Sequence, residues 1–521
     1  MAASPPNTTE PDPRRWRMLP LILVATFMAQ FDFFAVNVAA PVLRDDLHVD
    51  DAALELVVAG YAFTYASGMV TGGRLGDLFG YRRLFLIGVA AFALASLLCG
   101  IAATPGQLVA ARLLQGLTGA VMVPQVLALI TAGFPVHERS RALTWYGITG
   151  GVASIAGQVL GGLLLDADLF GLSWRNIFLV NVPVGLVLVI VAPRLLPAVA
   201  KAGHRPRLDP LGAVAISAGL ALALVPLALG HAEGWPLWTW ISLAASLPVL
   251  LLAIAWERRL TRRGGDPLLD LTLFRDRAFS GGLAVNVAFM AYWGGFMFVL
   301  ALFLQSGLGL SPTAAGLTFA PLGITFMATT FLGRRLSVRR GPVPVMALGF
   351  TLSGVGLLAL TAGLAVAGDG AGPVLVATTL GVVGLGNGLV MALLVGAVLS
   401  GVRPARAGAA SGVLTTTQQF ASATGVAVLG AVFFSVLGPD PDRAGYASTT
   451  ALIMAGAAGL LLVALALLRL LRTGARPAVA GAGSGGGGGT GGGAGGATRP
   501  APVEERRLVP AEAAEAPARA E

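Results

Sequence analysis

Charged residues are scarce in this sequence. Only 12% of the 521 residues are Asp, Glu, Lys or Arg, whereas 55% are hydrophobic and the mean hydropathy is +0.79. A soluble domain of this composition would have too few polar side chains to cover its surface. The scarcity of charge therefore excludes a soluble globular protein and predicts a polytopic membrane protein.

Cysteine and histidine are also few. Cys99 is the single cysteine and lies in an apolar run, which excludes a disulfide framework and a cysteine-based metal site. The four histidines are scattered in or beside the links between apolar runs: His48, His137, His204 and His231. Because they have no ligand spacing, we interpret them as solvated loop residues and predict no metal site.

Lysine is almost absent. Lys201 is the only lysine among 35 basic residues, and the rest are arginine. Together with the many alanine, glycine and proline residues, this bias indicates a GC-rich bacterial genome. The net charge of +9 does not indicate a nucleic-acid partner, because the basic residues lie in short links rather than on one amphipathic face.

What the sequence has in abundance is long apolar runs. A transmembrane helix needs about 20 mostly apolar residues. Fourteen runs qualify, at about 18–40, 52–72, 84–103, 107–132, 142–165, 176–196, 210–230, 237–256, 279–304, 313–332, 343–366, 373–400, 408–436 and 448–471. The first is too long for the apolar core of a signal peptide, so we expect it to be retained as a span.

Alternate links between these runs differ sharply in basic residues. One set of links carries the great majority of the arginines, whereas the opposite set carries only Arg44, Arg175 and Arg443. Cytoplasmic links of membrane proteins are rich in Lys and Arg. With fourteen spans, both termini are therefore predicted to be cytoplasmic.

The link between the second and third runs combines glycines with charges. It reads G-R-L-G-D-L-F-G-Y-R-R over Gly73–Arg83. Gly73 and Gly80 permit positive φ, and Asp77 can pair with the arginines or face a helix N-terminus. We expect a tight interfacial turn. The simpler alternative is a basic loop that only fixes topology.

Asp32 is a lone carboxylate in the first run. It lies about 14 residues into that run, roughly 21 Å along a helix that rises 1.5 Å per residue. An ionised carboxylate at that depth is costly, which points to a proton carrier or to an anionic contact for a cationic substrate. The alternative is a carboxylate that is solvated near the outer mouth or paired with a structural partner.

Arg112 is the only arginine well inside any run, and Gln115 follows it at helical spacing. Lipid cannot solvate a guanidinium, so Arg112 must meet a carboxylate, backbone carbonyls or a water-filled cavity. A role in proton coupling and a structural clamp on neighbouring carbonyls both fit this position.

The fifth run is dense in small residues. Its glycines include Gly147, Gly150, Gly151, Gly157, Gly161 and Gly162, with Gln158 among them. Small residues at spacings of three and four let helix backbones approach closely. Packing alone is therefore enough to account for the glycines, without a role in transport.

Several strings together resemble one family. Gly73–Arg83 resembles the loop between helices 2 and 3 of the major facilitator superfamily, and Arg112–Gly116 resembles its R-x-x-Q-G signature. Further strings are Asp32–Pro41 (D-x-x-x-V-N-V-A-x-P), Trp174–Gly185 (W-R-x-I-F-x-x-N-x-P-x-G), Pro267–Arg275 (P-L-L-x-L-x-L-F-R), Ala315–Pro321 and Ala410–Val413. Together they resemble the 14-span drug:proton antiporter branch of that superfamily (EmrB/QacA type).

This resemblance implies a fold and a division of the chain. The fold is an all-α polytopic major facilitator fold with two six-helix bundles, two extra linker helices and cytoplasmic N and C termini. The division is a cytoplasmic tail at 1–17, bundles at 18–196 and 279–471, a linker with two spans at 197–278, and a disordered Gly/Ala/Pro-rich tail at 472–521.

The resemblance also implies roles for individual residues. Proton coupling falls on Asp32 and Arg112. A conformational latch falls on Gly73, Asp77, Gly80, Arg82 and Arg83. The fifth run resembles the antiporter signature g-x-x-x-G-P-x-x-G-G, with Gln158 in place of its proline. The matching loop of the second half, Gly333–Gly341, has no aspartate, so we expect no second latch.

Other side chains within the runs are candidates for a substrate cavity. They are equally candidates for hydrogen bonds between helices. The set is Gln30, Phe34, Glu55, Tyr61, Gln115, Asn286, Trp293, Asn387, Gln418 and Gln419.

We predict proton-coupled efflux of hydrophobic or amphipathic small molecules, such as drugs, antibiotics or secondary metabolites, across the bacterial inner (plasma) membrane. The proton gradient drives this antiport by alternating access, so no cofactor is expected. Expected partners are the substrate, protons and membrane lipid, and we expect a monomer. One alternative is an importer or proton symporter with the same fold. Another is a polytopic membrane enzyme, which would need a convergent catalytic cluster that the scattered histidines do not supply.

Overall fold

The computed structural model describes residues 15–47, 51–196, 209–230, 233–265, 271–399, 402, 407–438 and 441–472. Regular secondary structure in these ranges is entirely helical. Three of the predicted segments lie outside the described residues: 1–14 of the N-terminal tail, the link at 197–208, and 473–521 of the C-terminal tail.

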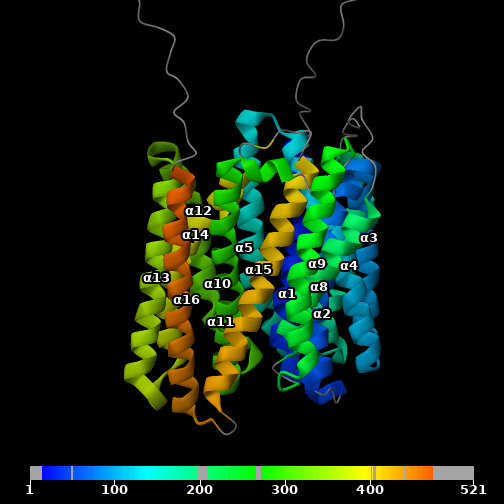
Figure 1. Ribbon diagram of the computed structural model, residues 1–521. Helices are drawn as coiled ribbons and strands as arrows, with labels where there is room; N and C mark the ends of the chain where they lie inside the picture. Colours follow the sequence, from blue (N-terminus) through cyan, green and yellow to red (C-terminus); the bar gives the residue numbers. More distant parts are fainter. Residues whose placement is uncertain are drawn as a thin grey trace, which may run out of the picture. The chain divides into compact units, whose positions relative to one another are not determined.

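The described ranges form three successive sets of helices (Figure 1). The first set is α1 (Arg15–Leu47), α2 (Asp51–Phe79), α3 (Tyr81–Gly100), α4 (Pro105–Gly133), α5 (Val136–Asp166), α6 (Arg175–Leu179) and α7 (Asn181–Leu195). A hairpin follows, of α8 (Pro210–Leu229) and α9 (Leu237–Arg262). The last set is α10 (Arg277–Leu302), α11 (Pro312–Thr318), α12 (Ala320–Arg340), α13 (Pro342–Ala367), α14 (Pro373–Leu399), α15 (Ala407–Leu437) and α16 (Arg443–Arg472).

Each of the fourteen apolar runs lies on a helix or on a pair of successive helices. Within the described residues, twelve helices are long and apolar enough to cross a bilayer, and α8 adds a shorter apolar stretch at Leu211–Leu227. The expectation of an all-helical, multi-span membrane protein is therefore confirmed.

Two of the runs are interrupted helices. The sixth run divides into α6 and α7 at Val180, and the tenth divides into α11 and α12 at Phe319. In both pairs the second helix has a proline in its first turn, Pro183 in α7 and Pro321 in α12. Proline is tolerated there because the first backbone N–H groups of a helix have no intrahelical partner. The first interruption places Asn181 at the N-terminus of α7.

The connection between α2 and α3 is shorter than the sequence predicted. We expected a tight turn over Gly73–Arg83 in which Gly73 and Gly80 permit positive φ. Instead α2 continues to Phe79, and of these two glycines Gly80 alone has a positive φ, of 92°. The helix continues through Gly73 where it packs against α4, and Gln125 of α4 donates a hydrogen bond to the Gly72 carbonyl at 2.7 Å. Arg74 and Asp77 pair at 3.5 Å one helical turn apart. The expected turn is thus reduced to one glycine.

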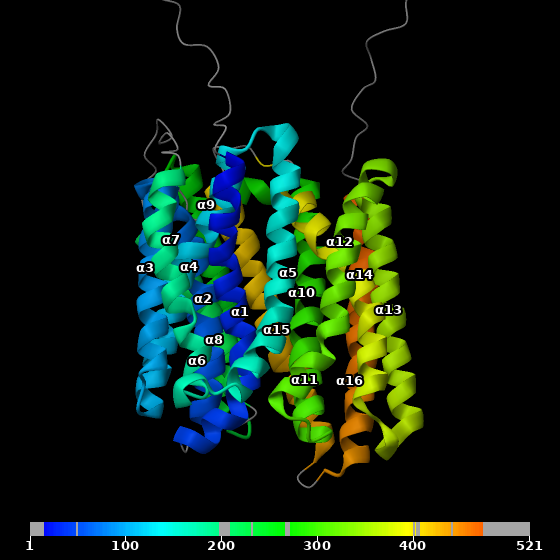
Figure 2. The same cartoon turned by 180° about the vertical axis from the view of Figure 1, so that it is seen from behind.

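The helices pack into two groups (Figures 1 and 2). In the N-terminal group, α1 to α7, the main pairs are α2 with α4, α1 with α5, and α3 with both α4 and α7. In the C-terminal group, α10 to α16, α10 packs on α15 and α16, and α14 packs on α12 and α13. The α8–α9 hairpin lies against α2.

The two groups meet along two lines of contact. On one side, α5 lies against α11, α12 and α14, as Figure 2 shows. On the other side, α15 lies against α2 and α4 (Figure 1). Any cavity between the groups is therefore bounded by α5 on one side and α15 on the other.

Candidate functional site

A buried ion pair lies inside the N-terminal group. Asp32 of α1 and Arg112 of α4 are both 0% exposed, and Nη1 of Arg112 donates a hydrogen bond to Oδ2 of Asp32. Removing two opposite charges from water is costly, and only close pairing with further hydrogen bonds offsets that cost. The arginine thus meets a carboxylate, one of the environments that its position in the sequence required.

Further hydrogen bonds complete the pair. Gln115 Nε2 donates to Asp32 Oδ1 at 2.8 Å, and Asn181 Nδ2 donates to the same oxygen at 3.2 Å. Arg112 donates from Nε to the Val57 carbonyl at 3.0 Å and from Nη1 to Gln115 Oε1 at 2.6 Å. Three further groups, one each from α2, α4 and α7, therefore converge on one carboxylate and one guanidinium.

Aromatic side chains cover the arginine. The guanidinium carbon lies 4.3 Å from the centroid of the Tyr61 ring and 5.6 Å from that of Phe178. A guanidinium over a ring face is stabilised by the ring quadrupole. The Tyr61 hydroxyl donates to the Ala29 carbonyl at 3.1 Å. Tyr61, expected to be a cavity residue, is therefore part of the wall around the ion pair.

The sequence did not identify two members of this cluster. Asn181 was visible as the asparagine of the W-R-x-I-F-x-x-N string, but nothing in the string indicated its partner. Ser96 of α3 accepts a hydrogen bond from Gln115 Nε2 at 2.8 Å and carries no sequence signal, since serine is common in membrane helices.

The glycines of α5 lie where that helix touches its neighbours. A methyl group at Gly157 would lie 2.8 Å from the Phe31 carbonyl oxygen of α1, and one at Gly147 would lie 2.5 Å from the Cα of Ala392 of α14. Gly161 faces α1, whereas Gly151 faces the Phe326 ring of α12 and Gly162 faces the Pro312 backbone of α11. The glycines thus let α5 pack closely against both groups at once.

Gln158 lies on the same helix and is 1% exposed. Its Nε2 has no hydrogen-bond partner within the part of the chain that the structure describes. α5 runs without interruption from Val136 to Asp166, so glutamine at this position accompanies a continuous helix.

A small cavity lies between the two groups. Its volume is about 30 Å³, and its wall comes from α1, α2, α4 and α5 on one side and from α10, α14 and α15 on the other. Seven of the lining side chains are polar or phenolic: Thr26, Gln30, Tyr65, Tyr146, Thr415, Gln418 and Gln419. Gln30, Gln418 and Gln419 are thus found on a cavity wall.

The other cavity candidates lie elsewhere. Gln115 belongs to the ion-pair cluster, and Asn387 is hydrogen-bonded to the Tyr292 hydroxyl at 3.0 Å and to Ser353 at 2.8 Å. Phe34 packs edge-on against Phe33. The side chain of Glu55 lies outside what the structure describes.

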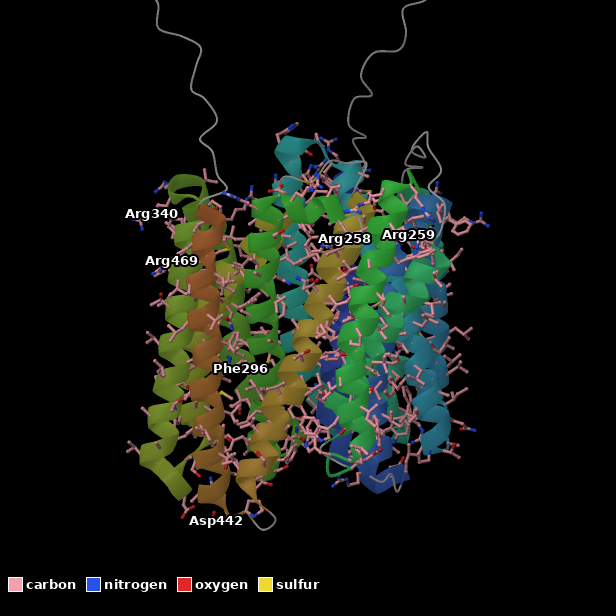
Figure 3. All side chains as sticks on the ribbon, viewed as in Figure 1. Arg258, Arg259, Phe296, Arg340, Asp442 and Arg469 are labelled. Atoms are coloured by element: carbon pink, nitrogen blue, oxygen red, sulfur yellow. The ribbon has the colours of Figure 1, made fainter. Side chains whose placement is uncertain are left out.

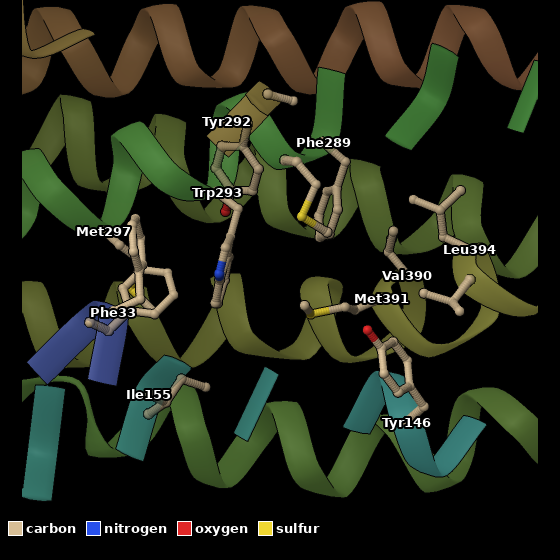
Figure 4. Close-up of a cluster of buried hydrophobic side chains, with 14 of the residues drawn as sticks. Phe33, Tyr146, Ile155, Phe289, Tyr292, Trp293, Met297, Val390, Met391 and Leu394 are labelled. Atoms are coloured by element: carbon tan, nitrogen blue, oxygen red, sulfur yellow. The ribbon is translucent and has the colours of Figure 1, made fainter. Parts of the chain in front are cut away.

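Asn286 and Trp293 lie on α10, about one helical turn to either side of the wall residue Met290, and are not among the residues that line the cavity. Gln418 donates a hydrogen bond to Asn286 Oδ1 at 3.2 Å. Figure 4 shows Trp293 reaching from α10 toward Phe33 and Ile155, which belong to the N-terminal group. Trp293 therefore lies at the interface between the groups, whereas the contact of Asn286 is with α15 inside the C-terminal group.

Asp77 lies beyond the end of the second apolar run. It accepts a hydrogen bond from the Tyr81 hydroxyl at 2.6 Å and is 12% exposed. Burial raises the pKa of Asp77 above its usual value, against the opposing effects of the Tyr81 hydroxyl and Arg74. Arg82 donates to the Pro193 carbonyl at 2.6 Å, so this connection is tied to α7.

Within the described residues there is no group of three or more His, Cys, Asp or Glu side chains close enough to hold a metal ion. What the structure does contain is a sealed ion pair inside the N-terminal group and a small cavity between two groups of apolar helices. Ionisable residues inside a membrane bundle, together with a cavity at the interface of two halves, define a secondary membrane transporter.

Comparison with known proteins places the chain in a family. Residues 22–426 match the model of the Major Facilitator Superfamily, and the chain belongs to that family. It is 40% identical over 441 residues to a protein named as a probable actinorhodin transporter from Streptomyces coelicolor, covering 84% of this chain and 75% of the relative. It is 31% identical over 435 residues to the tetracenomycin C resistance and export protein of Streptomyces glaucescens, covering 82% and 78%.

A solved structure shares the fold. The crystal structure of an auto-inhibited peptide transporter of the POT family matches with a TM-score of 0.59 at 18% identity, over 90% of this chain and 99% of that one. The protein is thus a multi-pass protein of the bacterial cell membrane. The expectation of a transporter rather than an enzyme is confirmed by the relatives, which are named as transporters and export proteins.

Proposed function

We propose that this protein exports hydrophobic or amphipathic small molecules across the bacterial plasma membrane in exchange for protons. The observation that carries the proposal is the Asp32–Arg112 pair, which places one protonatable carboxylate inside an otherwise apolar helix group. The relative named as a tetracenomycin C resistance and export protein supports the direction of transport.

We further infer fourteen spans with both termini in the cytoplasm. In support, all fourteen apolar runs lie on helices, and α1 begins at the same end of the bundle at which α16 finishes (Figures 1 and 2). Figure 3 shows Arg258, Arg259, Arg340 and Arg469 toward that end and Asp442 at the other. Arginine marks the cytoplasmic side. The N-terminal group then corresponds to the bundle at 18–196, and the C-terminal group to that at 279–471.

The exchange of a proton acts on the ion pair. While Asp32 is ionised, it accepts hydrogen bonds from Arg112, Gln115 and Asn181. A proton that arrives from outside neutralises the carboxylate, which removes the countercharge of Arg112 and turns one oxygen into a donor. The helices that carry these groups must then shift, and release of the proton to the cytoplasm restores the pair.

The structure supports a closed conformation for this cycle. The cavity of about 30 Å³ is far smaller than the 300–1,000 Å³ typical of a small-molecule site. Contacts between the groups exist toward both ends of α5. Thr313 Oγ1 donates to the Gly162 carbonyl at 3.1 Å at one end, and Arg139 Nη1 donates to the Val402 carbonyl at 3.4 Å at the other. Breaking one set at a time would open the cavity to one side.

The connection Gly73–Arg83 acts in this scheme as the cytoplasmic latch. Asp77 joins the end of α2 to the start of α3 through Tyr81, and Arg82 joins the start of α3 to the end of α7. Release of these contacts would let α2 move against α15. The protein works as a monomer in lipid, with substrate and protons as its partners and with no nucleic acid, metal or cofactor.

Direction of transport is the most direct test of this function. Everted and right-side-out vesicles containing the protein are supplied with a pH gradient and with three probes: acridone, ethidium and fluorescein. We expect at least one probe to accumulate in the everted vesicles only. Accumulation in right-side-out vesicles alone would show an importer, and no gradient-dependent movement of any probe would overturn the proposal.

A further inference from the structure

The wall of the central cavity carries no ionised side chain among the fourteen described residues that line it. Its ionisable members are Tyr65 and Tyr146, and phenols are neutral near pH 7. The Asp32–Arg112 pair is enclosed within the N-terminal group and is not on this wall. A charged molecule in the cavity would therefore have no countercharge on the wall.

That absence determines which molecules the cavity accepts. Moving an ion from water into an apolar site without a partner is strongly unfavourable, because the site does not replace the hydration of the charge. A neutral molecule avoids this cost. The cavity wall thus discriminates against permanent cations, which are common probes of drug pumps, and in favour of uncharged molecules.

Polar atoms around the cavity still lack hydrogen-bond partners. On α1, these are Oγ1 of Thr26 and Oε1 of Gln30, both from the wall. On α10, they are Nδ2 of Asn286 and Nε1 of Trp293. All four are buried atoms without a partner in the described part of the chain, where such groups are usually paired.

The two sets require opposite partners. The amide oxygen of Gln30 only accepts, so it needs a donor such as a hydroxyl or N–H group. Asn286 Nδ2 and Trp293 Nε1 only donate, so they need an acceptor such as a carbonyl oxygen. Asn286 and Trp293 flank the wall residue Met290 at helical spacings of four and three, which places them on one face of α10.

The remaining wall is suited to aromatic rings. The phenol rings of Tyr65 and Tyr146 lie on it, with the thioethers of Met69, Met290 and Met391. Figure 4 shows Tyr146 and Met391 next to each other across the interface of the two groups. Aromatic faces and thioether sulfurs both make favourable contacts with flat rings.

We propose that this cavity selects uncharged aromatic molecules that carry both a hydrogen-bond donor and a carbonyl-type acceptor, and that it rejects permanent cations. The inference rests on the proposed function, in that the cavity is the cargo site when the two groups separate. It narrows the cargo from any amphipathic compound to one chemical class.

A matched pair of fluorescent probes tests this selectivity. Acridone is a neutral three-ring molecule with one N–H donor and one carbonyl, and 10-methylacridinium has the same ring system with a permanent positive charge. Binding to the purified full-length protein is measured by fluorescence without a proton gradient. We expect the Kd of acridone to be at least tenfold lower than that of 10-methylacridinium. Equal or tighter binding of the cation, or no saturable binding of acridone, would overturn the proposal.

A variant of a wall residue tests whether the cavity wall determines this selectivity. Gln30→Glu adds a carboxylate to the cavity, and we expect at least a tenfold tighter binding of 10-methylacridinium. The matched control is Gln107→Glu, which adds the same charge at the exposed start of α4 and should leave both affinities unchanged. The same increase in affinity for 10-methylacridinium in both variants, or an increase in neither, would contradict the proposal that this wall determines selectivity.

A second variant removes a donor. Trp293→Phe should weaken acridone binding several-fold, because one hydrogen bond is lost, and should leave the cation unaffected. Asn286→Ala removes the other donor of the same helix face and serves if Trp293→Phe does not fold. Unchanged acridone binding in a folded variant would contradict the proposal. The binding measurements need no proton gradient, so they are independent of transport. Selective binding of acridone without gradient-driven transport would overturn the proposed export function but not the proposed selectivity of the cavity.

Discussion

Asn181 donates a hydrogen bond to Asp32 at 3.2 Å, although 149 positions separate the two residues in the chain. Asn181 is the first residue of α7, and its side chain reaches Asp32 on α1 inside the N-terminal group. The start of one helix is thus linked directly to the carboxylate that the exchange mechanism uses.

Replacement of Asn181 tests that link. Asn181→Ala removes one of the three hydrogen bonds that stabilise ionised Asp32. The carboxylate then holds a proton more readily, so we expect gradient-driven transport to reach half its maximum at a higher pH than in the wild type. The measurement is the pH profile of probe transport in vesicles, with Asn176→Ala as the control, since Asn176 donates to the Leu169 carbonyl and not to the ion pair. An unchanged profile would remove Asn181 from the coupling site.

The stability of the ion pair can be separated from its function. Asp32→Asn leaves Arg112 buried without a countercharge, and breaking a buried pair in this way costs about 3–5 kcal/mol. The double variant Asp32→Asn with Arg112→Gln leaves no unpaired charge. We therefore expect thermal unfolding of the double variant in detergent to recover most of the loss of stability, while gradient-driven transport stays absent. A double variant as unstable as the sum of its single changes would show that the two residues do not act as a pair.

The glycines of α5 give a prediction about packing. Gly157→Ala would place a methyl group 2.8 Å from both the Phe31 carbonyl oxygen and Phe34 Cβ. Overpacking of this kind costs about 1–3 kcal/mol, so the melting temperature should fall. Gly354→Ala in α13 is the matched control, because nothing lies within 4 Å of its added methyl group, and it should be neutral or stabilising by up to about 1 kcal/mol. Equal effects at both positions would refute close packing of α5.

Asp77 gives a pH-dependent prediction. Its pKa is raised in the folded protein, so ionisation of Asp77 opposes folding and protonation relieves that opposition. The stability of the wild type relative to Asp77→Asn should therefore increase as the pH falls from 7 toward about 4, near the usual carboxyl pKa. Melting curves of both proteins across this range provide the measurement. Parallel pH profiles would show that burial does not shift Asp77.

The sequence alone predicted the features that depend on local pattern. Long apolar runs are enough to predict helices, because only a helix satisfies its own backbone groups in lipid. The spacing of Arg112 and Gln115 placed both on one face of α4, and the cost of a buried guanidinium required a partner of the kind that Asp32 provides. These features follow from composition and helical periodicity.

Features that depend on distant segments were not predictable. Gly73 was expected in a turn because glycine permits one, but the helix continues there against α4, where Gln125 donates to the Gly72 carbonyl at 2.7 Å. Thr26, Tyr65 and Tyr146 line the cavity only because of how α1, α2 and α5 are rotated toward the C-terminal group. No local pattern fixes that rotation, since each of these helices is apolar around most of its circumference.

The most direct test of proton exchange at Asp32 is a measurement of proton movement during transport. Vesicles with an imposed pH gradient receive a transported probe, and a pH-sensitive dye reports the protons that move in exchange. We predict that the probe dissipates the gradient with the wild type and that neither Asp32→Asn nor the stabilised double variant does so, although both still bind the probe. If the double variant dissipated the pH gradient at the wild-type rate, Asp32 would not be the carrier of the exchanged proton.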